Sequence, residues 1–337
     1  MCYTLSNCVR GSALAETGGA RLLKILAVNY FEWPTENYEV FSKMGYEIDV
    51  VKPSDPPPVD DYEVGFFEAS YMTAHAEKLK NIKFVQMQTA GHNHLPVEFM
   101  RSNPGIQFCG GSGSYGKSIS EWAICGALQI LRQTPLFEGY RLEKKWSWEG
   151  SYDSRELWGS VCGVLGTGDI GTECAKKLHA FNCHVIGLNT SGHKAEHFDE
   201  CLPTTSIDEL CSRCDVLINT LPLTPGTKML VGRAQLEKCK KTAVIVNVSR
   251  GGIIDEEALA DMLDAGLLAG AAFDCYAVEP VPPESRLWDT KNFILNPHCC
   301  GVTMGLSRRY LEHYIQNAER YIHGQPLVGV ITPGRGY

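Results

Sequence analysis

The sequence contains no apolar run of the length that a bilayer span requires, and its first twenty residues hold no continuous apolar segment typical of a secretory signal. Positive charge is also scarce, because 31 Lys and Arg stand against 39 Asp and Glu, a net charge of −8. An acidic chain is a poor electrostatic partner for a phosphate backbone. We therefore expect a cytoplasmic protein with neither membrane nor nucleic acid as a partner, and we interpret residues 1–21 as an N-terminal extension.

The cysteines lack the spacing of a metal site or of a disulfide framework. The chain has 14 of them, spread through segments that otherwise indicate a large core. The closest pairs, Cys211 with Cys214 and Cys299 with Cys300, have no second pair at zinc-ribbon distance. His92 and His94 are close together but are typical of a surface loop. We expect free thiols in a reducing compartment, helix packing for Cys211 and Cys214, and no metal.

Short apolar segments alternate with polar spacers of helix length, which predicts parallel sheets with helices on their faces. The 337 residues, 44% hydrophobic and 21% charged, suit a globular protein of two domains. The expected strands are 24–28, 46–51, 62–67, 83–87, 161–165, 184–188, 216–221, 243–248, 269–273 and 292–296. Helices are expected at 35–44, 73–79 and 304–323, and a long one starting at Ser118, where Ser118-Ile-Ser-Glu121 matches a capping box.

The last six strands and their helices predict a Rossmann-type, doubly wound nucleotide-binding domain over residues 119–303. The final helix follows this complete domain, so we expect it to return to the first one. Residues 22–118 and 304–337 would then form a discontinuous, flavodoxin-like α/β substrate domain. The predicted fold class is therefore α/β with two domains.

A glycine-rich turn follows strand 161–165 directly and opens a helix. In this strand-turn-helix context, G-x-G-x-x-G predicts that backbone amides approach a pyrophosphate. The residues concerned are Gly166, Thr167, Gly168, Asp169, Ile170 and Gly171.

The next strand ends in Asn189, Thr190 and Ser191, where an acid would bind a ribose and repel a 2′-phosphate. His193 and Lys194 follow. The cofactor expected is NAD(P)(H), with NADP(H) favoured because Asn189 replaces the acid. The alternative is that Asn189 simply hydrogen-bonds an NAD ribose.

Three ionisable residues follow successive late strands: Arg250, Glu279 and His298. The carboxyl edge of an open α/β sheet is where ligands bind, so we expect the three to converge there. Histidine can donate a proton near neutral pH, and the planar fork of arginine can hold an anionic group, while a carboxylate on the other ring nitrogen would orient the imidazole.

Five stretches together resemble the D-isomer-specific 2-hydroxyacid dehydrogenase family, over about residues 24–325. They are Gly163-Val-Leu-Gly-Thr-Gly-Asp-Ile-Gly171, Leu221-Pro-Leu-Thr-Pro-Gly-Thr227, Val246-Asn-Val-Ser-Arg-Gly-Gly-Ile-Ile-Asp-Glu-Glu-Ala-Leu259, Phe273-Asp-Cys-Tyr-Ala-Val-Glu-Pro280 and Asn296-Pro-His-Cys-Cys-Gly301. The resemblance implies that Arg250 binds and polarises the oxoacid, that Glu279 pairs with His298, and that His298 is the acid/base.

The resemblance also implies further contacts. Asp274 would receive the nicotinamide carboxamide, and the cofactor would be lined by Leu221, Pro222, Thr227, Val248, Ser249 and Gly301. The segment after strand 83–87 resembles the family's substrate loop, so Ala90, Gly91 and His92 are expected to contact the substrate. Tyr115 and Lys117 would contact either the substrate or only the hinge.

The function expected is NAD(P)H-dependent reduction of a small 2-oxoacid to the D-2-hydroxyacid, and the reverse, on glyoxylate, hydroxypyruvate or a D-lactate-type substrate. A formate dehydrogenase is disfavoured because Glu279 stands where that group carries glutamine, and a phosphoglycerate dehydrogenase because only about a dozen residues follow the last expected helix. The alternative from another class is a dinucleotide-sensing corepressor-like binding protein of the same fold. The resemblance implies a homodimer, with Trp146 and Trp148 as the candidate contact; a lid or core packing would also explain these tryptophans.

Overall fold

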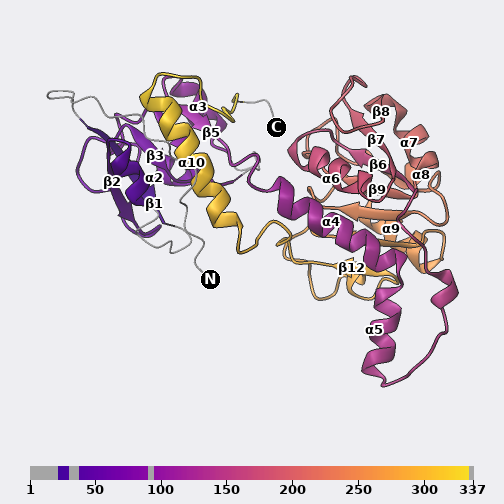
Figure 1. Cartoon of the computed structure of the whole chain (residues 1–337). Coiled ribbons are helices and arrows are strands. Elements are labelled where there is room, and N and C mark those ends of the chain that lie inside the picture. Colours follow the sequence, from indigo (N-terminus) through magenta and orange to yellow (C-terminus); the bar gives the residue numbers. More distant parts are fainter. Residues whose placement is uncertain (1–21, 30–37, 90–94, 334–337) are drawn as a thin grey trace.

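The protein folds into two α/β lobes, each built on a fully parallel sheet (Figure 1). The structure is a computed structural model, and it describes residues 22–29, 38–89 and 95–333. None of the described helices is both long and apolar enough to cross a bilayer.

The first lobe has five strands in the order β2-β1-β3-β4-β5. This is the strand order of flavodoxin-like folds, as the sequence predicts. Its elements are β1 (Leu23–Val28), α1 (Glu39–Lys43), β2 (Tyr46–Val51), β3 (Val64–Phe66), α2 (Ala69–Ala74), β4 (Phe84–Gln86), α3 (Val97–Ser102) and β5 (Gln107–Cys109).

The second lobe has seven strands in the order β12-β11-β10-β9-β6-β7-β8. This is the doubly wound Rossmann order with one added strand, and its switch point lies between β6 and β9. Its elements are α4 (Gly116–Leu131), α5 (Thr134–Leu142), β6 (Val161–Leu165), α6 (Asp169–His179), β7 (His184–Asn189), β8 (Glu200–Pro203), α7 (Ile207–Arg213), β9 (Val216–Asn219), α8 (Arg233–Leu236), β10 (Val244–Asn247), α9 (Glu256–Asp264), β11 (Gly270–Phe273) and β12 (Phe293–Leu295).

The last helix, α10 (Leu306–Ile322), returns to the first lobe, as its position in the sequence suggests (Figure 1). Its apolar face completes the core of the five-stranded sheet, where the Tyr314 ring stacks on Phe66 with centroids 4.3 Å apart. Asn317 Nδ2 donates to Gln86 Oε1 over 2.6 Å inside this core. The domain boundaries at 118/119 and 303/304 stay a prediction.

The long helix between the lobes does not begin where the capping box suggests. α4 begins at Gly116, and the Ser118 hydroxyl lies 3.2 Å from the carbonyl oxygens of Tyr115 and Gly301, either of which can accept its proton, instead of capping a helix. The Tyr115 hydroxyl is hydrogen-bonded to that of Tyr310, which ties this junction to α10. Ser118 therefore belongs to the contact between the lobes, and the capping prediction is wrong because tertiary partners outcompete the local motif.

Some elements were missed or misplaced by the sequence patterns. The strands β5 and β8 are short, and the edge strand β8 is only half-buried. Helix α5 follows directly on α4 and carries Pro135 in its first turn, where proline is tolerated. The helix expected at 73–79 is displaced, since α2 ends at Ala74. Cys211 lies in α7 and Cys214 caps it, both in the core, which confirms helix packing for this pair.

Candidate active site

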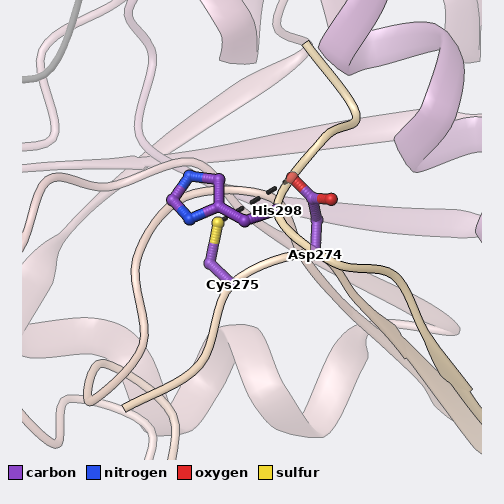
Figure 2. Close-up of side chains that lie close together, drawn as sticks. All are labelled: Asp274, Cys275 and His298. Carbon is purple, nitrogen blue, oxygen red and sulfur yellow. Dashed lines mark hydrogen bonds between the residues drawn. The ribbon is translucent and has the colours of Figure 1, made fainter. Parts of the chain in front are cut away.

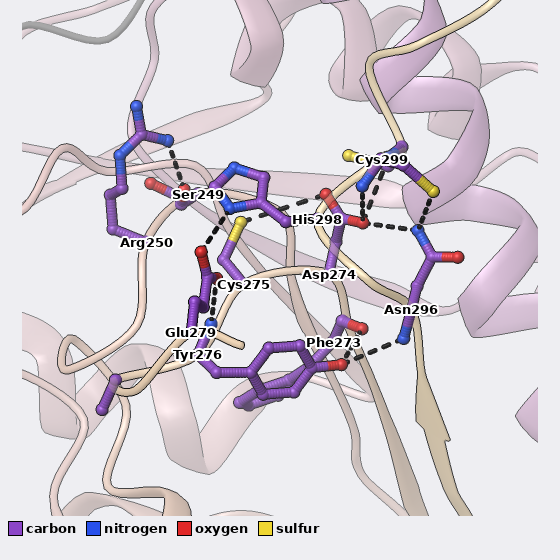
Figure 3. A network of polar contacts seen from close by, with 12 residues as sticks. Ser249, Arg250, Phe273, Asp274, Cys275, Tyr276, Glu279, Asn296, His298 and Cys299 are labelled. Carbon is purple, nitrogen blue, oxygen red and sulfur yellow. Dashed lines mark hydrogen bonds and ion pairs between the residues drawn. The ribbon is translucent and has the colours of Figure 1, made fainter. Parts of the chain in front are cut away.

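The carboxyl edge of the seven-stranded sheet brings the three expected catalytic side chains together (Figure 3). They lie in the loops after β10, β11 and β12. His298 Nδ1 is 2.7 Å from Glu279 Oε2, and the other oxygen of Glu279 accepts from Tyr276 N over 2.8 Å. With the carboxylate ionised, Nδ1 carries a proton, so Nε2 is the nitrogen that can exchange a proton with a substrate.

The backbone of His298 has an uncommon conformation. Its φ of 51° lies in the left-handed region, and its N–H donates to the carbonyl of Asn296 over 3.0 Å. Asn296 N is in turn 3.0 Å from the Tyr276 hydroxyl. A non-glycine residue in this region is held there by its surroundings, and such residues cluster at functional sites.

Arg250 is positioned through its neighbours. Its Nη1 donates to the Ser249 carbonyl over 2.6 Å, and its own carbonyl accepts from Asn247 Nδ2 over 3.1 Å. Asn247 Nδ2 also donates to Cys275 O over 3.1 Å, and Asn247 Oδ1 accepts from Asn219 Nδ2 over 2.9 Å. Both amides are fully buried at strand ends. The sequence patterns missed Asn219 and Asn247, although a polar amide closing an apolar strand is a usable signal.

Asp274 lies beside His298 and is almost fully buried (Figure 2). Its Oδ1 accepts from Asn296 Nδ2, from Cys299 N over 2.8 Å and from Cys300 N over 3.1 Å. Its Oδ2 has the Cys275 thiol at 3.9 Å, too long for a strong bond. One carboxylate oxygen therefore keeps capacity to accept a hydrogen bond from a ligand.

Asp274, Cys275 and His298 also form the one group of potential metal ligands found among the described residues. One ligand atom from each lies within 4.8 Å of the other two. Burial raises the pKa of the Cys275 thiol well above its usual range, so the neutral thiol is favoured there. The expectation of no metal stays a prediction.

The glycine-rich turn has the geometry that a pyrophosphate requires. A Cβ on Gly171 would lie 2.0 Å from the Gly166 carbonyl oxygen, so α6 packs too closely on the turn for any side chain there. A Cβ on Gly168 would meet open space, and no side chain caps the N-terminus of α6. The residues present thus fit a dinucleotide, because free amides of the first helical turn attract an anion.

Asp169, which we also expected at the cofactor, uses its side chain differently. Its Oδ2 accepts from Gly113 N over 3.0 Å, and this hydrogen bond joins the glycine-rich turn to the segment leading from β5 to α4. Asn189 is likewise engaged, since it bonds both the N–H and the carbonyl of His193 and thereby closes its own loop. Thr190 and Ser191 are exposed on that loop.

The other expected cofactor residues lie along the loops after β9, β10 and β12. Ser249 Oγ donates to the Leu221 carbonyl, and Thr227 Oγ1 donates to Pro222 O over 2.6 Å. Val248 is buried in the core, and Gly301 lies against the Tyr115 ring. The Ser249 contact joins the loop after β10 to the loop after β9.

The expected substrate residues Ala90, Gly91 and His92 lie outside the described residues. The start of their loop is held by Glu68, which accepts from Gln88 N over 2.8 Å and from Thr89 N over 3.1 Å. The Thr89 hydroxyl donates to the same carboxylate over 2.7 Å. Glu68 was missed from the sequence because nothing local links it to a loop twenty residues further on.

Comparison with known proteins shows which family shares this sequence and fold. Residues 124–300 match the family described as D-isomer specific 2-hydroxyacid dehydrogenase, NAD binding domain. An uncharacterised protein of Corynebacterium melassecola is 31% identical over 77% of this chain and 84% of its own length. A hydroxypyruvate reductase of Blautia hydrogenotrophica is 29% identical over 74% of the chain and 79% of its own.

A similar fold occurs in the crystal structure of an NADPH-dependent glyoxylate/hydroxypyruvate reductase from Sinorhizobium meliloti in complex with NADP and sulfate. Its TM-score is 0.74 at 24% identity, covering 94% of this chain and all of that one.

The fold and its carboxyl edge define a nicotinamide-dinucleotide-dependent oxidoreductase with two α/β domains. More narrowly, the chain belongs to the D-isomer-specific 2-hydroxyacid dehydrogenase family. It is accordingly an NAD(P)-dependent 2-hydroxyacid dehydrogenase or reductase.

Proposed function

We propose that the protein reduces a small 2-oxoacid, of the glyoxylate or hydroxypyruvate class, to the D-2-hydroxyacid with NAD(P)H, and catalyses the reverse reaction. The observation that carries this proposal is the 2.7 Å contact between His298 Nδ1 and Glu279 Oε2 at the sheet edge that also bears Arg250. A histidine oriented by a carboxylate is suited to donate a proton to a carbonyl oxygen, and an arginine beside it is suited to hold a carboxylate.

In this proposal Arg250 binds the substrate carboxylate through its planar fork and stabilises the charge that develops on the carbonyl oxygen. Glu279 stabilises the imidazolium of His298 through Nδ1. His298 then donates its Nε2 proton to the carbonyl oxygen of the substrate. In the oxidation direction the neutral imidazole accepts the same proton. The bound nicotinamide supplies or takes up the hydride.

The cofactor would lie with its pyrophosphate at the N-terminus of α6 and its carboxamide at Asp274 Oδ2. We propose NADP(H) as the preferred form. The exposed hydroxyls of Thr190 and Ser191, with Lys194 close by in the sequence, can bind a 2′-phosphate, and no acid at the end of β7 repels it. The similarly folded Sinorhizobium reductase has NADP in its crystal structure.

The test is incubation with NADPH or NADH and a panel of 2-oxoacids, followed at the nicotinamide absorbance band. We expect turnover with glyoxylate or hydroxypyruvate and a kcat/KM that is higher with NADPH. A tenfold preference for NADH would overturn the cofactor preference. No oxidation with any 2-oxoacid would overturn the reductase and favour the corepressor-like binding protein.

We also propose a homodimer. The arm formed by α5 and the following loop projects from the second lobe (Figure 1) and exposes Trp146 at 94% and Trp148 at 72%. This exposure contradicts core packing within one chain. A groove of about 500 Å³ between α4 and α6, lined by Ile124, Leu128 and Phe181 among others, offers an apolar surface for a second copy.

Analytical ultracentrifugation tests the dimer. The native chain should sediment as a dimer and a Trp146→Ser, Trp148→Ser double variant as a monomer, whereas a monomeric native chain contradicts the proposal.

A cytoplasmic location is a further part of the proposal, supported by the described cysteines, which are all free thiols.

A further inference from the structure

Two of the three loops that carry the proposed catalytic residues, those after β10 and β11, have backbones in contact. We name residues 249–252 the arginine loop and residues 274–279 the glutamate loop. A Cβ built on Gly251 would lie 1.8 Å from the carbonyl carbon of Tyr276, so only glycine allows this approach. Beneath the contact, the buried Asn247 amide bonds the carbonyls of Arg250 and Cys275. The first residues of the two loops are therefore joined by a buried side chain at the end of β10.

The outer parts of the two loops are tied by Glu256, the first residue of α9. Its Oε1 accepts from Ala277 N, in the glutamate loop, over 2.7 Å. Burial raises the pKa of Glu256, and the nearby backbone of Ala277 and of Gly252, in the arginine loop, lowers it. Only residues 253–255 separate Glu256 from the arginine loop, so its bond to Ala277 N links the segment that follows Arg250 to the loop of Glu279.

We propose that Glu256 is a positioning residue for the oxoacid reduction proposed above, on which this inference rests: it sets the distance between the Arg250 guanidinium and the His298–Glu279 pair. A substrate held by its carboxylate on Arg250 must present its carbonyl oxygen to His298 Nε2. A misplacement of 1 Å in such an arrangement costs roughly 100-fold in rate. A link that restricts the relative movement of the two loops should therefore increase the rate.

The neighbouring residue provides a matched control. Glu257 lies on the same first turn of α9 with an exposed side chain, and its Oε2 is 3.7 Å from Arg286 Nη1. It has the same charge and the same relation to the helix N-terminus, but no hydrogen bond from it to either loop is found in the described structure. Effects of helix capping or net charge would appear in both positions, and effects of the link only in Glu256.

The experiment compares Glu256→Ala, Glu256→Gln and Glu257→Ala with the native enzyme. Kinetics are measured with the best 2-oxoacid of the panel. The affinity of oxamate, an unreactive 2-oxoacid analogue, for the enzyme–NADPH complex and the affinity of NADPH itself are measured by nicotinamide fluorescence. Melting temperature reports folding, and kinetic constants refer to folded protein.

We expect Glu256→Ala to lower kcat/KM about tenfold and oxamate affinity about fivefold, as the loss of hydrogen bonds to a carboxylate implies, with NADPH affinity within about twofold of the native value. Glu256→Gln keeps a carbonyl acceptor for Ala277 N and should restore kcat/KM to within about threefold. Glu257→Ala should behave as the native enzyme.

Native-like kinetics of a folded Glu256→Ala overturn the inference, as does Glu256→Gln being as impaired as the alanine variant. Equal losses of oxamate and NADPH affinity also overturn it, because they indicate general loosening. If Glu256→Ala does not fold, Glu256→Asp keeps the charge with a shorter reach, and unchanged kinetics there overturn the proposal. A native enzyme without turnover overturns the proposed function instead, and this inference with it.

Discussion

The two sheets are built alike, but their reactive edges are held differently. In the seven-stranded sheet, the loops after β10 and β11 are joined by the buried Asn247 amide and by Glu256, both bonding backbone atoms. In the five-stranded sheet, the loop after β4 is held at its start by the Glu68 carboxylate. We propose that the seven-stranded edge positions the reacting groups and that the loop after β4 contributes to substrate binding. Changes at the first should lower kcat, and changes at the second should raise KM.

The largest effect is expected at His298. His298→Ala removes the proton donor and should lower kcat on the order of 100-fold or more, the usual scale for a general acid. Steady-state kinetics with the best 2-oxoacid would measure it. NADPH affinity, followed by fluorescence, serves as the control and should stay unchanged. A loss of less than about threefold would remove His298 from this role.

Glu279→Gln tests the partner of the imidazole. A neutral amide no longer accepts a charge-assisted hydrogen bond from His298 Nδ1, so the imidazole is held less firmly and reduction should be about tenfold slower. Steady-state kinetics in both directions measure this loss, and a kcat/KM within about twofold of the native value would contradict the pair.

Glu68→Ala tests the other sheet. Loss of the acceptor for Gln88 N, Thr89 N and the Thr89 hydroxyl should loosen the substrate loop and raise the KM for the 2-oxoacid roughly fivefold, with kcat within about twofold. The exposed Glu98→Ala on α3 is a control for charge. A fall in kcat as large as that of Glu279→Gln would contradict the proposal that the two sheet edges affect different kinetic constants.

The smallest effect is expected at Lys194. Lys194→Ala should raise the KM for NADPH by roughly threefold, the scale of one exposed ion pair, and leave the KM for NADH unchanged. Raising the salt concentration should reduce the difference between native and variant enzyme. Equal changes with both cofactors would show that Lys194 does not face a 2′-phosphate.

Much of this fold could be predicted because its signals are local. Buried parallel strands are short apolar runs, the glycine-rich turn follows such a run directly, and the three proposed catalytic residues lie in the loops that follow three others. What the patterns missed depends on tertiary partners. Asn247 and Glu68 gain their roles only when separate loops meet, and Ser118 loses its capping role because Gly301 lies next to it. Short β5 and half-buried β8 carry too few apolar residues to indicate strands.

The return of α10 to the first lobe has a consequence for synthesis on the ribosome. The core of the five-stranded sheet includes Tyr310 and Tyr314, which are translated after every strand that the structure describes. The seven-stranded lobe needs no such late segment, so it can fold while the chain is still growing. Until α10 emerges, the apolar face around Phe66 lacks its cover, and a nascent chain stalled before residue 306 would be a substrate for chaperones.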